Sequence, residues 1–518
     1  MRTQKNKGAY YTPIKLSNFI VKYLDECFTD NLSILEPSVG DGSFIKALNN
    51  SFRTRKKVDI TIVDLDKLEL EKAKKEGSIH NKFTKIVDIN DDFLTFHKKH
   101  SKQYDLVIGN PPYIKSNLLA KKQIELCKEI HKNENLLDKK INNIWTAFIV
   151  GANKFLKKDA ILAYVLPTDL LQVKYAEEIR VFLEEQFDRL EIFTLDKYMF
   201  DDIEQHTVLL FAYKKSNEKG TFFYKITDIK ENKFEKISSN GLMIYETKWT
   251  HYILEPDEIK LLNSINKKLD RVDDYIISKP GIVTGANKYF ILDKDKVKEH
   301  KLEKYVEPIV QKSLFIKNNI DLNEKDIQHL INSHKPMFLL SLKDDTKVTK
   351  NLESYLSLGR KESIDKRYKC SIRNNWYCIP NISLPTEGFF FKRYHKVPKL
   401  IRNSANVHVT DSAYKIVMKD HFNINSFIYS FFNIVTLIFS ELIGRKYGGG
   451  VMELIPSEFK NLPIYYQTIE SKVFNSFEKE FNEEVVFNNE VFEYLNLNEE
   501  EIVMLENIYT KLTQARMH

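Results

Sequence analysis

Tyr104-Asp105-Leu106-Val107-Ile108-Gly109 leads directly into Asn110-Pro111-Pro112-Tyr113, and the rest of the chain is organised around this stretch. The apolar run predicts a buried strand, and open α/β sheets place their chemistry just past the carboxyl ends of strands. Two successive prolines end the strand and fix the backbone. The Asn110 side-chain oxygen and the Pro111 carbonyl then become two fixed acceptors beside the flat ring of Tyr113. They suit a planar amino group, such as a nucleobase amine or a glutamine amide; a proline-stiffened turn capped by Asn110 is the alternative.

A strand, a glycine turn and a helix come earlier, between Ile34 and Leu48. Gly40 and Gly42 allow a ligand to approach the backbone closely. The turn lacks both the dinucleotide-binding fingerprint and the lysine of a P-loop, which disfavours a phosphate ligand. The acidic Glu36 and Asp41 favour a cationic ligand instead, and S-adenosylmethionine, with its sulfonium and ammonium groups, fits. A plain turn between a strand and a helix is the alternative.

Two more predicted strands end in acidic residues. The strand 58–63 ends at Asp64, where a carboxylate is placed to bind ribose hydroxyls. The third unit ends in residues 88–94, where Asp92 could accept from an adenine amino group and Phe93 could stack on the ring; a solvated acidic loop is the alternative. Four strand ends therefore converge on one crevice, and this agreement is stronger evidence than any single motif.

The chain begins with a Tyr11-Thr12-Pro13 motif followed by a predicted amphipathic helix. Apolar residues recur at helical spacing from about Ile14 to Cys27. Thr12 is placed to act as the N-cap, with Pro13 in the first turn. Taken alone, this motif indicates only the start of a helix.

The order of these motifs resembles the gamma class of adenine-N6 DNA methyltransferases, the group that includes the TaqI methylase. In that family a Thr-Pro motif is followed by Glu-Pro-x-x-Gly-x-Gly, then Asn-Pro-Pro-Tyr, then a target-recognition domain. Other methyltransferase classes permute these blocks, so the order is informative. The resemblance implies an α/β fold in which a Rossmann-like S-adenosylmethionine-dependent methyltransferase domain occupies residues 1–245. An α+β target-recognition domain with C-terminal helices would then occupy residues 246–518.

The resemblance also implies a role for each matching position. Asn110, Pro111, Pro112 and Tyr113 would be catalytic and would hold a flipped-out base. Phe200 is the candidate to stack on that base opposite Tyr113, with a core aromatic as an equal alternative. The cofactor site would be lined by Thr12, Glu36, Pro37, Gly40, Asp41, Gly42, Asp64, Asp92 and Phe93.

The second half resembles the family's specificity domain in three stretches, 281–288, 398–402 with 410–414, and 448–464, and only weakly over 300–375. Glycines beside Lys288, Arg445 or Lys446 would allow close approach to a phosphate backbone. Arginine, lysine and asparagine side chains can read base edges, but one sequence does not decide which of them do so.

Composition agrees with a chain of two or three domains that have sizeable cores. The 518 residues are 42% hydrophobic, and a net charge of +7 permits a nucleic-acid partner without requiring one. The four cysteines, Cys27, Cys127, Cys370 and Cys378, form no Cys-x-x-Cys pair, so we expect no disulfide, no metal site and a reducing compartment. The N-terminus lacks a signal-peptide core. The most apolar stretch, 427–443, is broken by polar residues, which favours a buried helix over a membrane span. We therefore expect a cytoplasmic protein.

The predicted function is methyl transfer from S-adenosylmethionine to N6 of a flipped-out adenine in double-stranded DNA, which would protect host DNA in a restriction-modification system. A separate cognate endonuclease is compatible with the resemblance, but an orphan methylase would look the same. A monomer is the family's default.

Three rival functions stay open at this point. The first is a methyltransferase acting on RNA or on a non-DNA amide such as protein glutamine, although glutamine methyltransferases are much shorter. The second is a specificity module that binds DNA without activity, which intact Glu36, Asp64 and Asn110 argue against. The third is a fused restriction enzyme, which we do not expect because the chain begins at the Thr-Pro motif and no nuclease motif follows Ile464.

Overall fold

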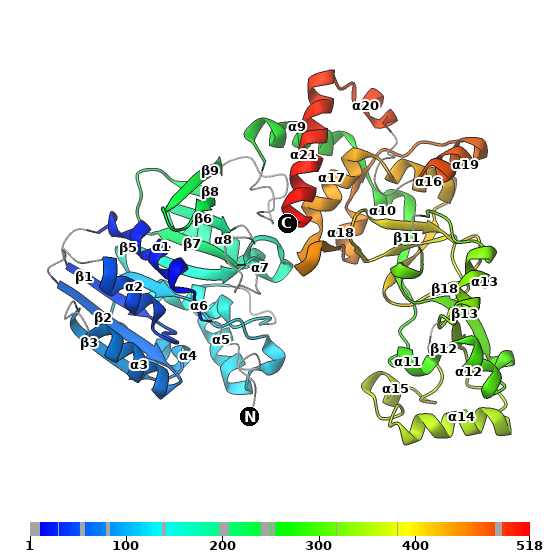
Figure 1. The fold of residues 1–518 in the computed structure, drawn as a ribbon, viewed down its shortest axis with the longest axis horizontal. Helices are drawn as coiled ribbons and strands as arrows, with labels where there is room; N and C mark the ends of the chain where they lie inside the picture. The colour runs from blue at the N-terminus through cyan, green and yellow to red at the C-terminus, as the bar shows by residue number, and fades with distance from the viewer. Residues whose placement is uncertain are drawn as a thin grey trace. The chain divides into compact units, whose positions relative to one another are not determined.

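The computed structural model describes residues 11–28, 31–51, 57–78, 83–136, 141–195, 207–239, 249, 254–316, 319–380, 382–481 and 489–517. The chain divides into two compact units, Met1–Lys260 and Leu261–Met517, which are considered separately below (Figure 1). We call them unit 1 and unit 2. The predicted domain boundary near Tyr245 lies outside the described residues, so its position stays a prediction.

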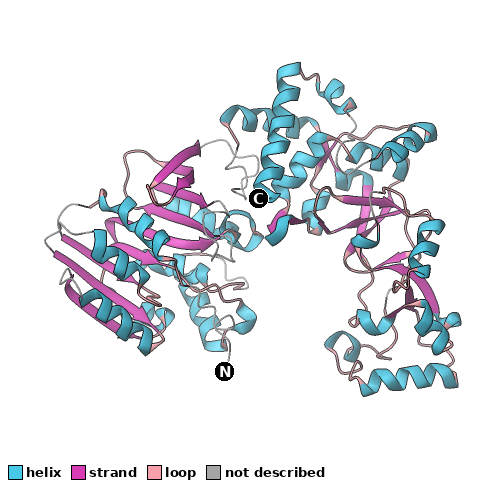
Figure 2. Ribbon diagram, viewed as in Figure 1, coloured by secondary structure: helices cyan, strands magenta, loops and turns pink. Residues whose placement is uncertain are grey.

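Unit 1 is built on a sheet, whose strands are magenta in Figure 2, and the strand order is β3-β2-β1-β4-β5-β7-β6-β8-β9. The strands from β3 to β5 in this order are parallel, whereas β7 is antiparallel to both of its neighbours. The order confirms the predicted Rossmann-like α/β architecture. The strands are β1 (Asn31–Glu36), β2 (Lys57–Asp64), β3 (Phe83–Asn90), β4 (Tyr104–Gly109), β5 (Leu156–Pro167), β6 (Arg189–Leu195), β7 (Thr207–Tyr213), β8 (Gly220–Asp228) and β9 (Lys233–Ser239).

Helices cover both faces of this sheet. Successive residues of a strand point to opposite faces, so Ile34 packs with the first group of helices and Leu35 with the second. The first group is α1 (Ile14–Asp25), α2 (Ser43–Ser51) and α3 (Lys67–Ser78). The second group is α4 (Phe93–Lys99), α5 (Lys121–Asn133), α6 (Trp145–Ala152), α7 (Asp169–Gln172) and α8 (Glu177–Gln186).

The strand order reverses between β1 and β4. From β1 the chain moves outward through β2 to β3, and it then returns to place β4 and β5 on the other side of β1. The carboxyl ends of β1 and β4 therefore flank the topological switch point, where open α/β sheets bind their ligands. Glu36 is the last residue of β1, and Asn110 directly follows β4.

The start of α1 corrects one prediction. The helix begins at Ile14 as expected, but it ends at Asp25, and its N-cap is Pro13 rather than Thr12. Pro13 has φ −55° and ψ 136°, so its carbonyl accepts hydrogen bonds from the backbone nitrogens of Leu16 and Ser17. Thr12 is buried instead of capping the helix.

Unit 2 combines small sheets with many helices (Figure 2). Its sheets have the orders β11-β19-β15-β17, β12-β14-β13-β18, β16-β21-β20 and β10-β22. The strands are β10 (Asp270–Arg271), β11 (Ile276–Pro280), β12 (Ile291–Leu292), β13 (Val306–Val310), β14 (Phe338–Leu340), β15 (Gly388–Phe391), β16 (Arg393–Tyr394), β17 (Lys399–Arg402), β18 (His408–Val409), β19 (Ala413–Met418), β20 (Arg445–Tyr447), β21 (Val451–Glu453) and β22 (Pro463–Ile464). The helices, after α9 (Pro256–Lys268) at the division between the units, are α10 (Val272–Tyr275), α11 (Asn287–Phe290), α12 (Lys294–Glu299), α13 (Glu324–Asn332), α14 (Lys350–Lys361), α15 (Tyr368–Ser371), α16 (Ile424–Phe431), α17 (Ile434–Ile443), α18 (Pro456–Lys460), α19 (Ser471–Glu480), α20 (Glu490–Leu495) and α21 (Glu499–Met517).

The apolar stretch 427–443 forms two helices rather than the single buried helix expected. Asn433 separates α16 from α17, because its Oδ1 accepts from the Thr436 nitrogen at 2.9 Å and its Nδ2 donates to the Ser430 carbonyl at 2.7 Å. Within the described ranges, no single helix is long and apolar enough to span a membrane. The pair α16 and α17 would suffice in length and composition, but it is bent by 75°, and nearly all of its residues are buried.

Candidate functional site

The Glu-Pro motif and the Asn-Pro-Pro-Tyr motif lie against each other at the ends of β1 and β4. A Cβ atom on Gly109 would stand 3.5 Å from Pro37 Cδ and 3.8 Å from Glu36 Cγ. Ser38 Oγ donates a hydrogen bond to the Asn110 carbonyl at 3.1 Å. The two motifs, far apart in sequence, thus form one site at the topological switch point.

Glu36 is the most unusual side chain of this site. It is 0% exposed, and neither carboxylate oxygen has a hydrogen-bond partner among the described residues. Burial, followed by the nearby charges of Asp41 and Asp64, raises the pKa of Glu36 well above its usual range. A buried carboxylate without a partner is costly, and a cationic ligand group would relieve that cost.

The glycine turn after β1 has the conformation that its residues predict. Gly40 has φ +51° and Gly42 has φ +77°, in the left-handed region that favours glycine. A Cβ atom on Gly42 would also approach Ala73 Cα to 3.1 Å. The turn is fixed from the neighbouring strand end, because Asp64 Oδ2 accepts a hydrogen bond from the Gly40 nitrogen at 2.9 Å.

The Asp64 carboxylate therefore accepts hydrogen bonds from backbone nitrogens in this structure. Its other oxygen, Oδ1, accepts from the Asp66 nitrogen at 2.9 Å. Each oxygen still has a second lone pair, so binding of ribose hydroxyls by Asp64 stays a prediction. Leu65, which sequence reasoning missed, is 66% exposed beside it. Asn90 Nδ2 holds this corner by donating to the carbonyls of Asp64 and Leu65, both at 3.0 Å.

A cavity of about 450 Å³ opens next to the glycine turn. It brings together three of the predicted cofactor residues, Thr12, Asp41 and Gly42, but it does not reach Glu36, Asp64 or Asn110. Tyr11 stands at its edge, 3.2 Å from where a Cβ atom on Gly40 would lie. The lining residues are Tyr11, Thr12, Pro13, Ile14, Asp41, Gly42, Ser43, Lys46 and Glu76.

Asp92 and Phe93 have structural partners that the sequence did not reveal. Asp92 is the N-cap of α4, where its Oδ1 accepts from the Leu94 nitrogen at 2.9 Å. Its Oδ2 accepts from Gln123 Nε2, also at 2.9 Å. The Phe93 ring is buried with its centroid 4.5 Å from that of Phe148. Stacking of adenine on Phe93 stays a prediction, and the burial of its ring argues against it.

The loop that carries Asn110 and Tyr113 is anchored at its far end. The Ile144 nitrogen donates to the Ile114 carbonyl, and the Ser116 nitrogen donates to the Asn142 carbonyl, both at 3.0 Å. Pro111 is buried and Tyr113 is partly buried against the core. These contacts hold the two predicted acceptors on a fixed backbone. Phe200 lies outside the described residues, so its stacking role is untested.

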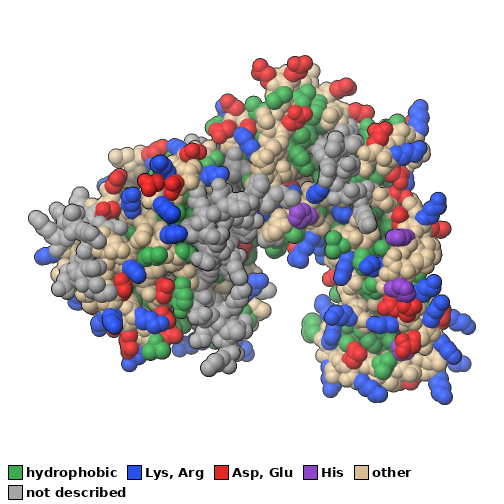
Figure 3. Space-filling view, viewed as in Figure 1, with side chains coloured by type: hydrophobic (Ala, Val, Ile, Leu, Met, Phe, Trp, Pro, Cys, Tyr) green, Lys and Arg blue, Asp and Glu red, His purple; other side chains and the backbone are tan. Residues whose placement is uncertain are grey.

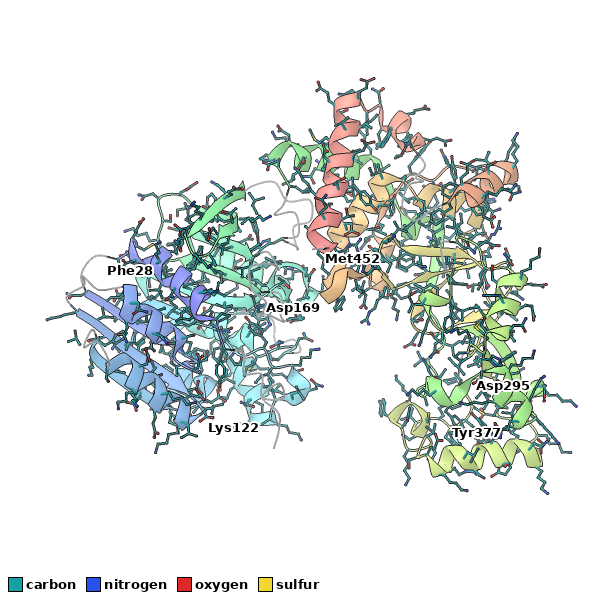
Figure 4. The ribbon with its side chains drawn as sticks, viewed as in Figure 1. Phe28, Lys122, Asp169, Asp295, Tyr377 and Met452 are labelled. Atoms are coloured by element: carbon teal, nitrogen blue, oxygen red, sulfur yellow. The ribbon has the colours of Figure 1, made fainter. Side chains whose placement is uncertain are left out.

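A polar pair at the end of β5 was also missed by sequence reasoning. Asp169 begins α7, with one residue between it and the end of β5 (Figure 4), and its Oδ2 accepts from the Tyr175 hydroxyl at 2.7 Å. β4 and β5 are neighbours, with Gly109 opposite Tyr164, so Asp169 belongs to the same edge of the sheet as Asn110. The signal was an acidic residue just past a predicted strand end.

The described residues contain no group of three or more His, Cys, Asp or Glu side chains that could hold a metal ion. None of the four cysteines, all of which lie in the described ranges, forms a disulfide bond; Cys27 is exposed and the other three are buried.

Two family models match the two halves of the chain. Residues 15–200 match the family model of the Eco57I restriction-modification methylase, and residues 246–503 match that of the C-terminal domain of the type II methyltransferase M.Eco57I. The type II methyltransferase M.AccI of Acinetobacter calcoaceticus is 25% identical over 479 residues, which cover 88% of this chain and 84% of that protein.

Two further similarities are more limited. The tRNA1(Val) (adenine(37)-N6)-methyltransferase of Tolumonas auensis is 30% identical over 131 residues, 25% of this chain and 50% of that protein. The type IIL restriction-modification enzyme MmeI, solved in complex with DNA, superposes with a TM-score of 0.54 at 12% identity, covering 97% of this chain and 72% of that one; this likeness concerns the fold alone. The two family models account for both halves of the chain, which belongs to the Eco57I family of type II restriction-modification methyltransferases.

Proposed function

We propose that this protein transfers a methyl group to N6 of a flipped-out adenine within a specific sequence of double-stranded DNA. In this proposal it is the modification enzyme of a restriction-modification system, and it belongs to the gamma class by the order of its motifs. The observation that carries the proposal is the contact between the two strand ends: the buried, unpartnered carboxylate of Glu36 lies beside the loop that begins at Asn110.

S-adenosylmethionine is the cofactor of this family, and it supplies the methyl group as an electrophile. The residues present fit it. The unpartnered Glu36 carboxylate suits a cationic group of the cofactor, and the glycine turn admits it close to the backbone. Asp64 would bind the ribose hydroxyls through its free lone pairs, and the exposed Leu65 offers an apolar surface for the base.

The loop at the end of β4 would act on the target amine. Its lone pair is delocalised into the adenine ring, which makes it a poor nucleophile. Hydrogen bonds donated by the amine to Asn110 Oδ1 and to the Pro111 carbonyl would favour a tetrahedral nitrogen and release the lone pair. Held by these two acceptors, the nitrogen would be oriented toward the methyl group that the cofactor supplies when bound, and the proton that the nitrogen loses on methylation would leave to water. Tyr113 would stack on the base.

A duplex conceals this amine, so the adenine must leave the base stack before it can react. Unit 2 would bind the duplex, as the match to the C-terminal domain of a type II methyltransferase supports. Lysine and arginine side chains are spread over the visible face of both units, interspersed with acidic ones, rather than gathered in one band (Figure 3).

An RNA substrate is the runner-up, favoured by the likeness of a quarter of the chain to a tRNA adenine-N6 methyltransferase. The presence of the second unit, matched by a type II methyltransferase domain, favours DNA.

The deciding experiment is single-molecule sequencing of DNA from a methylation-free host that expresses this chain. N6-methyladenine confined to one short motif is the expected result. Unmodified DNA from a host that contains folded, cofactor-binding protein would overturn the proposal, and methylated host RNA in its place would establish the runner-up.

A further inference from the structure

Two lysines face each other on neighbouring antiparallel strands of unit 2. β11 and β19 pair so that Lys279 lies opposite Lys415, and Ile277 lies opposite Val417. Directly opposed residues in such a pair have Cβ atoms about 4.5–5.5 Å apart, and like charges there destabilise the sheet. The sheet therefore carries an unfavourable pair that its own strands do not compensate.

Lys415 is unusually buried for a lysine. It is 8% exposed, and its Nζ donates a hydrogen bond to Ser383 Oγ at 2.7 Å. Burial, and then the ammonium group of Lys279, lower the pKa of Lys415 below its usual range. In the part of the chain that the structure describes, no carboxylate forms an ion pair with Lys279 or Lys415. A buried ammonium that lacks a counter-charge costs folding free energy.

Exposed aliphatic residues are close to the two lysines in the sheet register. Ile277 and Val417 share their face of the sheet and are both exposed, and Leu384, next to Ser383, is 85% exposed. The β11–β19 patch is defined here as Ile277, Lys279, Ser383, Leu384, Lys415 and Val417. It offers two cations and a hydroxyl to an anion, with apolar surface on either side.

We propose that the β11–β19 patch binds a phosphate group of the DNA backbone. The ammonium groups of Lys279 and Lys415 would hold the phosphate oxygens, and the Ser383 hydroxyl would help to orient Lys415. Ile277, Val417 and Leu384 would lie against the neighbouring sugars. A phosphate fits because it supplies, in one group, oxygens for both lysines and the missing negative charge. This inference rests on the proposed action on DNA and adds a specific contact to it.

Such a contact positions DNA without reading its sequence. Loss of either lysine should therefore weaken binding of every duplex by the same factor and leave the preference for the recognition sequence unchanged. The stability of the free protein should stay the same or rise, because loss of one charge removes the repulsion between the two lysines. This combination of weaker binding and undiminished stability distinguishes a ligand site from a structural role.

The test compares Lys279→Gln and Lys415→Gln with the wild type and with Lys472→Gln. Lys472 is a matched control because it is an exposed lysine of unit 2 that already pairs with Glu470 at 2.9 Å. Fluorescence anisotropy would follow binding of two duplexes of about 30 base pairs, roughly three helical turns, over a range of salt concentrations. One duplex contains the recognition motif that the protein methylates, and the other lacks that motif. Thermal unfolding of each free protein completes the comparison.

Each patch variant should reduce the slope of log affinity against log salt by about 1, and should weaken both duplexes by about tenfold at roughly 0.1 M salt. Its melting temperature should equal or exceed that of the wild type. If the wild type binds tightly but the salt slopes of the two patch variants equal that of Lys472→Gln, this inference is overturned while the proposed function stands. A fall in melting temperature that accounts for the lost binding would assign the lysines a structural role instead. A wild type that binds neither duplex would overturn the proposed function as well.

Discussion

Glu36, at the end of β1, lies beside Gly109, at the end of β4, so closely that a Cβ atom on Gly109 would stand 3.8 Å from Glu36 Cγ. At that distance a Cβ atom would be in ordinary van der Waals contact with the Glu36 side chain, so the end of β4 lies directly against the buried acid. The loop that carries the proposed acceptors begins at the next residue, Asn110. This relationship makes the charge of Glu36 the first quantity to measure.

Glu36→Gln should change how the stability of the cofactor-free protein depends on pH. Burial raises the pKa of Glu36 above the value near 4.5 of an exposed glutamate, so the folded state holds the proton more tightly than the unfolded state. The wild type then loses stability as pH rises from about 4.5 through the folded pKa, whereas the variant lacks this loss. The difference in unfolding free energy between variant and wild type should grow in the variant's favour by at most about 1.4 kcal/mol per pH unit.

Urea denaturation at several pH values from about 4.5 to 8 would measure this difference. The same samples should show that the cofactor raises the melting temperature of the variant less than that of the wild type, because the counter-charge is gone. A difference that stays flat with pH would contradict the raised pKa of Glu36.

Asn110→Ala should abolish turnover and spare cofactor binding. The side-chain oxygen of Asn110 is one of two acceptors proposed to activate the target amine, and its loss should lower kcat by about 100-fold or more, comparable to loss of one preorganised hydrogen-bonding group elsewhere. Isothermal titration with cofactor and a methylation assay on DNA would measure both effects. Asn133→Ala, on the exposed end of α5, is the control and should change neither. Turnover by Asn110→Ala at the wild-type rate would reject the assignment.

The sequence predicted those parts of unit 1 where local signals agree. The apolar run 104–109 predicts a strand, and the two prolines that follow predict that the strand ends before them. The two signals agree on the same bounds, and β4 has those bounds. The strand before Gly40 and the helix after Gly42 were predictable for the same reason, because only glycine adopts those positive φ angles without strain. The order of motifs then gave the positions of the strand ends in the sheet.

The partners of the acidic side chains could not be predicted, because they come from distant segments. Asp92 pairs with Gln123 on another helix, and Asp64 holds Gly40 from a neighbouring strand. The sequence alone does not show whether a carboxylate will contact a ligand or a backbone nitrogen. The break between α16 and α17 was missed because Asn433 acts as a cap only when its side chain turns back onto the next helix.

Gly42→Ala and Gly449→Ala should separate two costs of replacing a glycine. Both glycines have φ between +70° and +80°, a conformation that costs other residues about 1–2 kcal/mol. A Cβ atom on Gly42 would also press on Ala73 at 3.1 Å, whereas one on Gly449 would meet nothing within 4 Å. Crowding typically adds about 1–3 kcal/mol, so Gly42→Ala should lose more stability in urea denaturation and should also weaken cofactor binding. Equal losses would show that the helix bearing Ala73 moves aside freely.

Arg516→Met should destabilise unit 2 strongly. Arg516, near the end of α21, is buried together with Glu441 of α17, and its Nε donates to Glu441 Oε2 at 2.9 Å. Its guanidinium also donates to the carbonyls of Gly450 at 2.6 Å and Lys396 at 3.1 Å. The variant leaves a buried carboxylate and these carbonyls without their donor, a loss of about 3–5 kcal/mol.

Two further variants make this loss interpretable by urea denaturation. Arg360→Met removes the exposed pair of Arg360 with Glu353 and should cost less than about 1 kcal/mol. The double variant Arg516→Met, Glu441→Leu should recover much of the stability lost by Arg516→Met alone, because it removes the stranded charge while the volume stays filled. If the double variant is no more stable than Arg516→Met, the loss comes from the backbone carbonyls near Gly450 that Arg516 holds, or from the ammonium of Lys446, which loses its favourable interaction with Glu441.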